Sequence, residues 1–237
     1  LLKRPVESFK YLLSTVETSN VEMDFFALHL DMVLIASTND TYLEAFKEHP
    51  DFPSFKGRME LIKVPYLLHY AQEKEIYTQT ISEKILGKHV APHTIEIVAF
   101  WGVLTRMRRN DPERHAKAIR ALIKDLTPIE KLRLYDKGDF PERLTRQEER
   151  LLLQNLPLLY KETLSYPNYE GRFGASAREL KTILLNAAHD EHFDFLNPES
   201  VFLEIENLLG SKSVYPFLKQ EIVGKFHDHK AFLEQTR

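Results

Sequence analysis

The sequence predicts a mainly α-helical protein with a small α/β part at its N-terminal end. Two observations support this fold class. From Leu1 to about Tyr66, runs typical of β-strands alternate with amphipathic helix, whereas after Tyr66 nearly every segment has helical periodicity. The chain has 237 residues, 43% of them hydrophobic, which is enough to bury a substantial core.

The composition excludes several classes of function. Lys and Arg (32) nearly balance Asp and Glu (35), so no global charge favours a nucleic-acid or anionic-membrane partner. There is no Cys, which excludes disulfides, thiolate catalysis and Cys-based zinc sites and fits a reducing compartment. No apolar run reaches the roughly 18 to 20 residues that span a bilayer, and no signal-peptide pattern opens the chain. We therefore expect a cytoplasmic protein.

The first region predicts an amphipathic helix, a hairpin-like segment "VEMDFFAL" and two strands. The strands are "DMVLIAS" (31–37) and "MELIKVPY" (59–66). A covered parallel sheet normally has about five strands, so these two predict a sheet whose other strands lie further towards the N-terminus. Self-association is a second way to cover such an edge. The first strand ends in Ser37, Thr38, Asn39 and Asp40, which brings four small polar side chains to one edge of the sheet.

Helix starts are clear in the second region, because N-cap residues precede Pro or are followed by Glu three residues later. These caps are Asp111, Thr127, Thr145 and Asn197. Between them, "TIEIVAFWGVLTRM" predicts a buried central helix, and "LLLQNLPLLY" predicts a helix that is bent or ended near Pro157.

The stretch "EGRFGASARELKTILLNAA" predicts a helix that starts with a capping box. Ser176 and Glu179 have the required spacing, which places Arg178 in the first turn. A cation there opposes the helix dipole at a cost of about 0.3 to 1 kcal/mol, whereas a phosphate is drawn to that end. Arg178 therefore suits an anion site. The alternative is a solvated Arg beside the compensating charge of Glu179.

Arg58 stands immediately before the second predicted strand, where most Arg residues are surface charges. Its place in the order of features gives it more weight. Asn39 at a strand end, Arg58 before the next strand, a change to helices and Arg178 at a late helix start form the layout of the second half of an AAA+ ATPase module. The phosphate-binding pattern G-x-x-x-x-G-K-[ST] is absent from the sequence.

With these motifs, the chain resembles the PrkA-type serine protein kinases, a bacterial family with an AAA+ domain. The resemblance rests on "ASTND", on "FKGRMELIKVPYLL", on "GKHVAPHT" and on "YEGRFGASARELKTILLNAA", and it continues into "SVYPFLKQEIVGKFHDHKAFLEQTR". It implies a chain that begins after the second Walker motif, so that the ligands of the ATP phosphates and Mg²⁺ lie upstream. It also implies that the kinase-like region of the family lies further downstream.

The resemblance implies roles for three residues. Asn39 is similar to the sensor-1 residue, which reaches the γ-phosphate and the attacking water. Arg58 is similar to the arginine finger that acts on the nucleotide of a neighbouring subunit, although Gly57 replaces the acidic residue that the family tends to have before it. Arg178 is similar to sensor 2, which closes over the phosphates from the same subunit.

The same resemblance gives expectations for domains, cofactors and partners. Residues 1–66 are expected to be the remainder of the AAA+ core, 67–210 a helical lid with an insertion at about 111–165, and 211–237 a tail leading to a downstream domain. We expect the intact protein to use ATP and Mg²⁺, to form a homo-oligomer and to act on a protein substrate, without nucleic acid or membrane. Neither ATP nor Mg²⁺ is expected to bind tightly to this chain alone. The alternative is a helical regulatory or docking module with vestigial AAA+ features.

Three further clusters have simpler explanations. The His pairs His189/His192 and His227/His229 have the spacing of metal ligands, but a solvated helix end and an exposed tail explain them. The basic cluster "RMRR" (106–109) predicts a solvated helix C-terminus, where the dipole favours cations. The amphipathic "ERHAKAIRALIKDL" (113–126) suits either a partner helix or packing within the lid.

Overall fold

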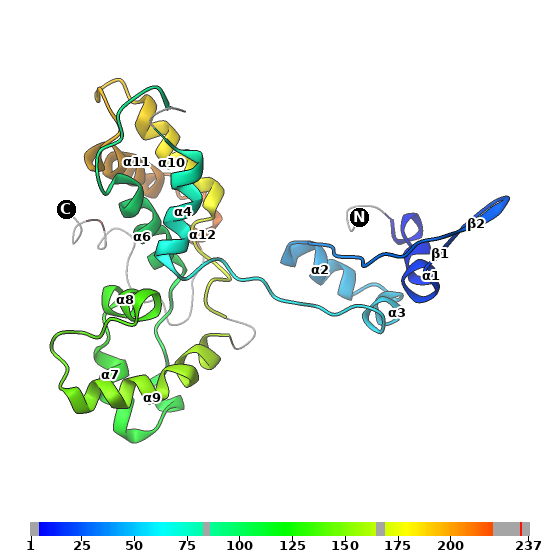
Figure 1. Ribbon diagram of the computed structural model, residues 1–237, viewed down its shortest axis with the longest axis horizontal. Helices are drawn as coiled ribbons and strands as arrows, with labels where there is room; N and C mark the ends of the chain where they lie inside the picture. The colour runs from blue at the N-terminus through cyan, green and yellow to red at the C-terminus, as the bar shows by residue number, and fades with distance from the viewer. Residues whose placement is uncertain (1–4, 83–85, 165–168, 220–232, 234–237) are drawn as a thin grey trace. The chain divides into compact units, whose positions relative to one another are not determined.

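A computed structural model describes residues 5–82, 86–164, 169–219 and 233, and Figure 1 shows its helices and strands. The chain forms two compact units, Leu1–Val64 and Pro65–Arg237. Helices dominate the described residues, and the only sheet among them has two strands. The predicted fold class, mainly α with a small α/β part, is therefore confirmed.

The first unit contains one hairpin and a few short helices. Strands β1 (Asn20–Met23) and β2 (Phe26–His29) pair antiparallel, with Val21 opposite Leu28, which confirms the predicted hairpin. The unit has a small aromatic core in which the rings of Phe9, Phe46 and Phe55 lie 5.2 to 5.9 Å apart. Its helices are η1 (Val6–Ser8), α1 (Tyr11–Thr18), α2 (Asp40–Lys47) and α3 (Phe52–Lys56).

The two predicted strands at 31–37 and 59–66 do not form. Both segments lack regular secondary structure, and their apolar side chains face solvent, as in Val33 (88% exposed), Ile35 (89%) and Val64 (84%). The expectation of strands here is wrong for the structure, because a strand exists only when a neighbour pairs with its backbone groups. Neither segment has a strand neighbour within the part of the chain that the structure describes.

The second unit is helical. Its predicted N-caps are confirmed, since the side chains of Thr127, Thr145, Ser176 and Asn197 each accept a hydrogen bond from the backbone N–H three residues on. Asp111 caps a short 3-10 helix, η2. The elements are α4 (Tyr70–Thr80), α6 (Thr94–Arg106), η2 (Pro112–Arg114), α7 (Lys117–Asp125), α8 (Pro128–Lys137), α9 (Arg146–Thr163), α10 (Ala177–His189), α11 (Pro198–Gly210) and α12 (Pro216–Lys219).

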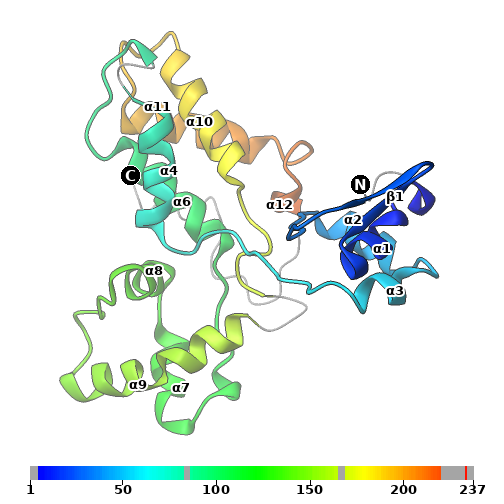
Figure 2. The ribbon, with the colours of Figure 1, turned by 45° about the vertical axis from the view of Figure 1, so that its right-hand side comes forward.

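Helix α6 is the buried centre of this unit, as its sequence predicts. Trp101, Val103 and Leu104 are fully buried, and α6 contacts α4, α8, α10 and α11. Helix α10 lies close to α6, and a β-carbon at Gly102 would overlap the side chain of Leu180. Figures 1 and 2 both show α10 beside α11, with α7, α8 and α9 grouped on another side of the unit. The close approach to α6 fixes the position of α10.

Helices α9 and α7 each bear on one expectation from the sequence. Helix α9 continues through Pro157 to Thr163, so of the two predicted outcomes, a bend or an end near Pro157, the end is wrong. The loss of one backbone hydrogen bond at an interior Pro is tolerated here because packing holds the helix on both sides of it. Helix α7 buries Ile119 and Ile123 and contacts α9, so packing within the unit accounts for its amphipathic pattern.

We predict that Gly102→Ala destabilises the chain, although alanine is the better helix former. Overlap with Leu180 outweighs the gain in helix propensity, and we expect a net loss of about 1 to 2 kcal/mol in the free energy of unfolding. Urea unfolding measures it. Gly210→Ala is the matched control, because a β-carbon there meets open space. Equal stabilisation by both substitutions would contradict the close packing of α6 and α10.

Candidate functional site

The side chain of Arg106, the last residue of α6, is fully buried and joins three parts of the second unit. Its two terminal nitrogens donate to the two carboxylate oxygens of Glu73 on α4, each at 2.8 Å. Nε donates to the carbonyl of Ala175 at 2.9 Å, and Nη1 also donates to the carbonyl of Leu67 at 3.0 Å. The expectation that the basic cluster 106–109 is a solvated helix end is therefore wrong for Arg106.

The chemistry of the pair explains how a full charge is accommodated there. A buried ion costs several kcal/mol, and only a well-aligned partner and further hydrogen bonds compensate this cost. The planar fork of Arg matches a carboxylate at two points and has donors left for carbonyls, which the single ammonium of Lys lacks. The hydroxyl of Tyr77 also donates to Glu73, and burial, followed by this carboxylate, raises the pKa of Tyr77. The ion pair is thus fully hydrogen-bonded.

A second buried ion pair lies nearby. Nζ of Lys131 on α8 donates to Glu170 at 2.7 Å and to the carbonyl of Arg108 at 2.5 Å. The same Glu170 oxygen accepts from the backbone N–H of Arg108 at 2.7 Å. Burial lowers the pKa of Lys131, and the carboxylate of Glu170 opposes that change. This pair ties α8 and the end of α6 to the residue that begins the "EGRFGAS" motif.

The segment Tyr169–Ser176, which carries this motif and leads into α10, is attached along its length. The backbone N–H of Gly171 donates to Arg106, and its carbonyl accepts from Tyr66 at 2.8 Å. The backbone N–H of Ala175 donates to Thr105 Oγ1 at 2.9 Å. Gly174 has a φ of +130°, and a β-carbon there would come within 2.6 Å of the Arg106 side chain. Only glycine fits this approach. The 169–176 segment therefore enters α10 from a fixed position.

Arg178 lies where the sequence predicts, in the first turn of α10. The capping box is complete, with Ser176 N–H donating to Glu179 at 2.6 Å and Glu179 N–H donating to Ser176 Oγ at 3.3 Å. The side chain of Arg178 is exposed and has no ion pair among the residues described. An exposed cation beside the positive end of a helix is an arrangement that a bound anion stabilises.

Asn39 and Arg58 belong to the first unit. Asn39 is the N-cap of α2, and its Oδ1 accepts from the backbone N–H of Tyr42 at 3.3 Å. Arg58 follows α3 and forms an ion pair with Glu17 at 2.9 Å and a hydrogen bond to the carbonyl of Ser54. Asn39 and Arg58 are in one unit and Arg178 in the other, so a joint role for the three stays a prediction.

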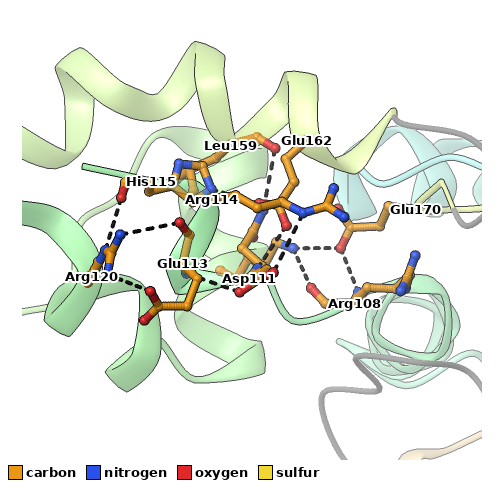
Figure 3. A network of polar contacts seen from close by, with 11 residues as sticks. Arg108, Asp111, Glu113, Arg114, His115, Arg120, Leu159, Glu162 and Glu170 are labelled. Carbon is orange, nitrogen blue, oxygen red and sulfur yellow. Dashed lines mark hydrogen bonds and ion pairs between the residues drawn. The ribbon is translucent and has the colours of Figure 1, made fainter. Parts of the chain in front are cut away.

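A third network connects the end of α9 to the residues after α6 (Figure 3). The carboxylate of Glu162 accepts from Asn110 Nδ2 at 2.7 Å and from the N–H of Asp111 at 2.8 Å, and it pairs with Nε2 of the buried His115 at 2.7 Å. Burial opposes ionisation of Glu162, but these hydrogen bonds outweigh it and lower its pKa. The network stabilises the junction between α6 and α7.

Pockets among the described residues of the second unit include two with charged linings. One of about 250 Å³ opens beside the His115–Glu162 pair, with Arg114 and Lys161 among its lining residues. The other, of about 820 Å³, lies between α4, α6, α8 and the loop that follows α8. Its lining residues include Glu130 and Arg143, which form an ion pair at 2.9 Å. Charges of both signs line the larger pocket, so it does not select one class of ligand.

The metal-like spacing of His189 and His192 has a local explanation. Nδ1 of His189 lies 2.7 Å from the carbonyl of Leu185, and Nδ1 of His192 lies 2.7 Å from Asp190. Across the described residues, no group of three or more His, Asp or Glu side chains is arranged to hold a metal ion. His227 and His229 lie outside the described residues.

Comparison with known protein families identifies the class of this chain. Residues 1–114 match the PrkA AAA domain, and residues 129–237 match the PrkA serine protein kinase C-terminal domain. Both matches are to domains of one family and together they cover most of the sequence, so the chain belongs to the PrkA family. This confirms the family resemblance of the sequence motifs. No solved structure matches the chain.

Several curated proteins are similar to it, and two of them carry different names. The ATP-dependent protease PrkA of Bacillus subtilis (strain 168) is 30% identical over 138 residues, which cover 57% of this chain and 20% of the relative. The serine/threonine kinase YeaG of Escherichia coli (strain K12) is 22% identical over 211 residues, covering 87% of this chain and 29% of the relative. The chain thus spans less than a third of either relative, and their names attribute different activities to them.

The family matches give the buried ion pairs a new context. The resemblance implied a kinase-like region downstream of this chain, and residues 129–237 match the C-terminal domain of the PrkA serine protein kinases. Arg106 and Glu73 lie in the AAA match, whereas Ala175 and Arg178 lie in the C-terminal match. The two matched regions share the second compact unit from Pro65 onwards. None of the helices described is long and apolar enough to cross a membrane.

We predict that Glu162→Gln costs about 1 to 3 kcal/mol of stability at pH 7, because hydrogen bonds to a carboxylate become hydrogen bonds to an amide. The folded state lowers the pKa of Glu162 from 4.5, so this contribution is complete above pH 4.5 and is lost as the pH falls through the folded pKa. Measured by urea unfolding, the difference between the two proteins should stay constant from pH 7 down to the unfolded pKa of 4.5 and shrink as the pH falls further, through the folded pKa. The exposed Glu142→Gln is the control. A difference that stays constant below pH 4.5 would contradict the assignment.

Gly174→Ala tests the contact between the 169–176 segment and Arg106. Its β-carbon meets backbone atoms of Arg106 and its φ is positive, so we expect a loss of more than about 2 kcal/mol. Gly138→Ala is the control for a positive φ in open surroundings, because its φ of +72° lies in the left-handed region, which costs alanine about 1 to 2 kcal/mol. Urea unfolding measures the free energy of unfolding of both variants. Equal losses of stability would show that the close approach of Gly174 to Arg106 is unimportant.

Proposed function

We propose that this chain supplies three residues of the ATP site of a PrkA-family protein. Asn39 acts as sensor 1, Arg58 as the arginine finger and Arg178 as sensor 2, with ATP and Mg²⁺ bound by the intact protein. The observation that supports this best is Arg178, an exposed cation in the first turn of α10 whose helix start is fixed by a capping box and by the 169–176 segment.

The residues present fit part of such a site. Arg178 and the N-terminal backbone N–H groups of α10 suit the negative charge of phosphate. In this proposal the Mg²⁺ ligands come from another part of the intact protein. The chain's own contribution is therefore to bind and orient phosphate groups.

Each residue has a distinct chemical task. Arg178 neutralises phosphate charge from its own subunit. The amide of Asn39 donates and accepts hydrogen bonds without taking a proton, which suits the orientation of a water molecule. Arg58 stabilises the charge that develops at the nucleotide of a neighbouring subunit, and such a contribution is worth about 10³ to 10⁵ in rate in other nucleotide hydrolases. To do so it must exchange its ion pair with Glu17 for the nucleotide.

This proposal includes a homo-oligomer, because an arginine finger acts between subunits. The second relative's name describes a serine/threonine kinase, and the match to the C-terminal domain of the PrkA serine protein kinases favours phosphoryl transfer to a protein over proteolysis. Cytoplasmic localisation is part of the same proposal.

A second candidate function is a helical regulatory or docking module without a role in nucleotide binding. Its support is that Asn39 already caps α2 and Arg58 already pairs with Glu17, so both side chains have structural roles. The two candidates differ in what removal of Arg178 does to nucleotide affinity.

Steady-state ATP hydrolysis by the intact protein, measured against protein concentration, tests the proposal. We expect turnover to rise with concentration and to fall at least about 10³-fold in Arg58→Ala and markedly in Asn39→Ala. The exposed residues Arg133 and Asn207, each changed to Ala, are matched controls that should retain activity. Absence of hydrolysis, or hydrolysis indifferent to both substitutions, would favour the docking module.

A further inference from the structure

We propose that Arg106, with Thr105, is a positioning residue for Arg178. It acts by holding the segment from which α10 starts and thereby connects the AAA and C-terminal regions of the chain. The inference rests on the proposed role of Arg178 in binding nucleotide and extends it to residues that do not themselves touch the ligand.

Three contacts place the start of α10 relative to α6. The guanidinium of Arg106 donates to the carbonyl of Ala175 at 2.9 Å, the hydroxyl of Thr105 accepts from the N–H of Ala175 at 2.9 Å, and Gly174 lies directly against Arg106. Ser176, the N-cap of α10, is the next residue along the chain. Both backbone groups of Ala175 are therefore fixed one residue before the helix begins.

Arg106 is in turn fixed by α4. The double hydrogen bond to Glu73 and the bond to the carbonyl of Leu67 use its two terminal nitrogens, so its side chain has one arrangement that satisfies every partner. A Lys at this position keeps the charge but cannot bind Glu73 at two points and Ala175 at a third. A shift of α4 or of the end of α6 is thus transmitted to Ala175 and to the first turn of α10.

The consequence for function is a physical connection between two regions. Glu73, Thr105 and Arg106 belong to the AAA match, whereas Ala175 and Arg178 belong to the C-terminal match. Because a ligand bound at Arg178 and the arrangement around Arg106 share one set of contacts, each should influence the other by the same free energy. Nucleotide binding would therefore change the stability of the contacts around Arg106, where the two regions meet.

A double-mutant cycle on nucleotide affinity tests the proposal. The dissociation constant of a fluorescent ATP analogue is measured for the intact protein, for Arg106→Lys, for Arg178→Ala and for the double variant. We expect Arg106→Lys to weaken binding about tenfold on its own and less than about twofold in the Arg178→Ala background, because Arg106 acts only through Arg178. The inference would be overturned if Arg106→Lys raised the dissociation constant by the same factor with and without Arg178→Ala, or did not change it at all.

Thr105 provides a second variant pair that keeps the test decisive if Arg106→Lys does not fold. Thr105→Val removes the acceptor for the Ala175 N–H while keeping the branched shape, and Thr105→Ser retains the hydroxyl. We expect Thr105→Val to lower the affinity for the ATP analogue and Thr105→Ser to leave that affinity unchanged. In the Arg178→Ala background, the Val and Ser variants should bind the analogue equally. Equal affinities of the Val and Ser variants would overturn the positioning role.

Different results would reject the nucleotide role of Arg178 and the positioning role of Arg106. Unchanged affinity in Arg178→Ala would remove the nucleotide role of Arg178 and, with it, the basis of the positioning role. Weaker binding in Arg178→Ala together with unchanged binding in Arg106→Lys and Thr105→Val would keep the proposed function and reject the positioning role alone.

Discussion

The buried ion pair of Arg106 and Glu73 is the constraint on which the arrangement of the second unit depends. It joins α4 to the end of α6, and the remaining donors of Arg106 hold Leu67 and Ala175. A buried pair of this kind contributes little net stability compared with an apolar pair, but removal of one partner leaves an uncompensated charge. Its effect is therefore to select one arrangement of the surrounding segments. The Lys131–Glu170 pair does the same for α8 and the beginning of the 169–176 segment.

This arrangement makes one structural unit from regions that match two family domains. The AAA match ends at residue 114 and the C-terminal match begins at residue 129, inside the segment expected to be an insertion in the lid. The structure keeps α4 and α6 in the same compact unit as α8, α10 and α11. The hydrophobic core is continuous across them, with Trp101 and Leu104 from one match and Leu180, Ile183 and Val201 from the other. Changes on one side of the boundary therefore affect the packing of the other.

The first unit shows how far a strand depends on its neighbours. The segments 31–37 and 59–66 have the composition of buried strands, yet they expose Val33, Ile35 and Val64. The hairpin β1–β2 forms because its two strands are adjacent in the chain and need only each other. Asn39, expected at a strand end, is instead defined by the helix that follows it, through its hydrogen bond to Tyr42. Local interactions have decided its geometry where long-range pairing is absent.

Features that depend on neighbours in the chain were predictable from the sequence. These are the fold class, the hairpin, the buried helix α6, the capped helix starts and the place of Arg178 in the first turn of α10, because capping and periodicity act over three or four residues. Which charges are buried follows instead from contacts between segments that are far apart in the chain. The sequence around Arg106 is typical of a solvated helix end. Its hydrogen-bond partners Glu73, Leu67 and Ala175 are all more than four residues away in the chain, so no local pattern reveals them. The same holds for Lys131 and Glu170, because a buried ion pair arises only where the packing of separate elements brings its two members together.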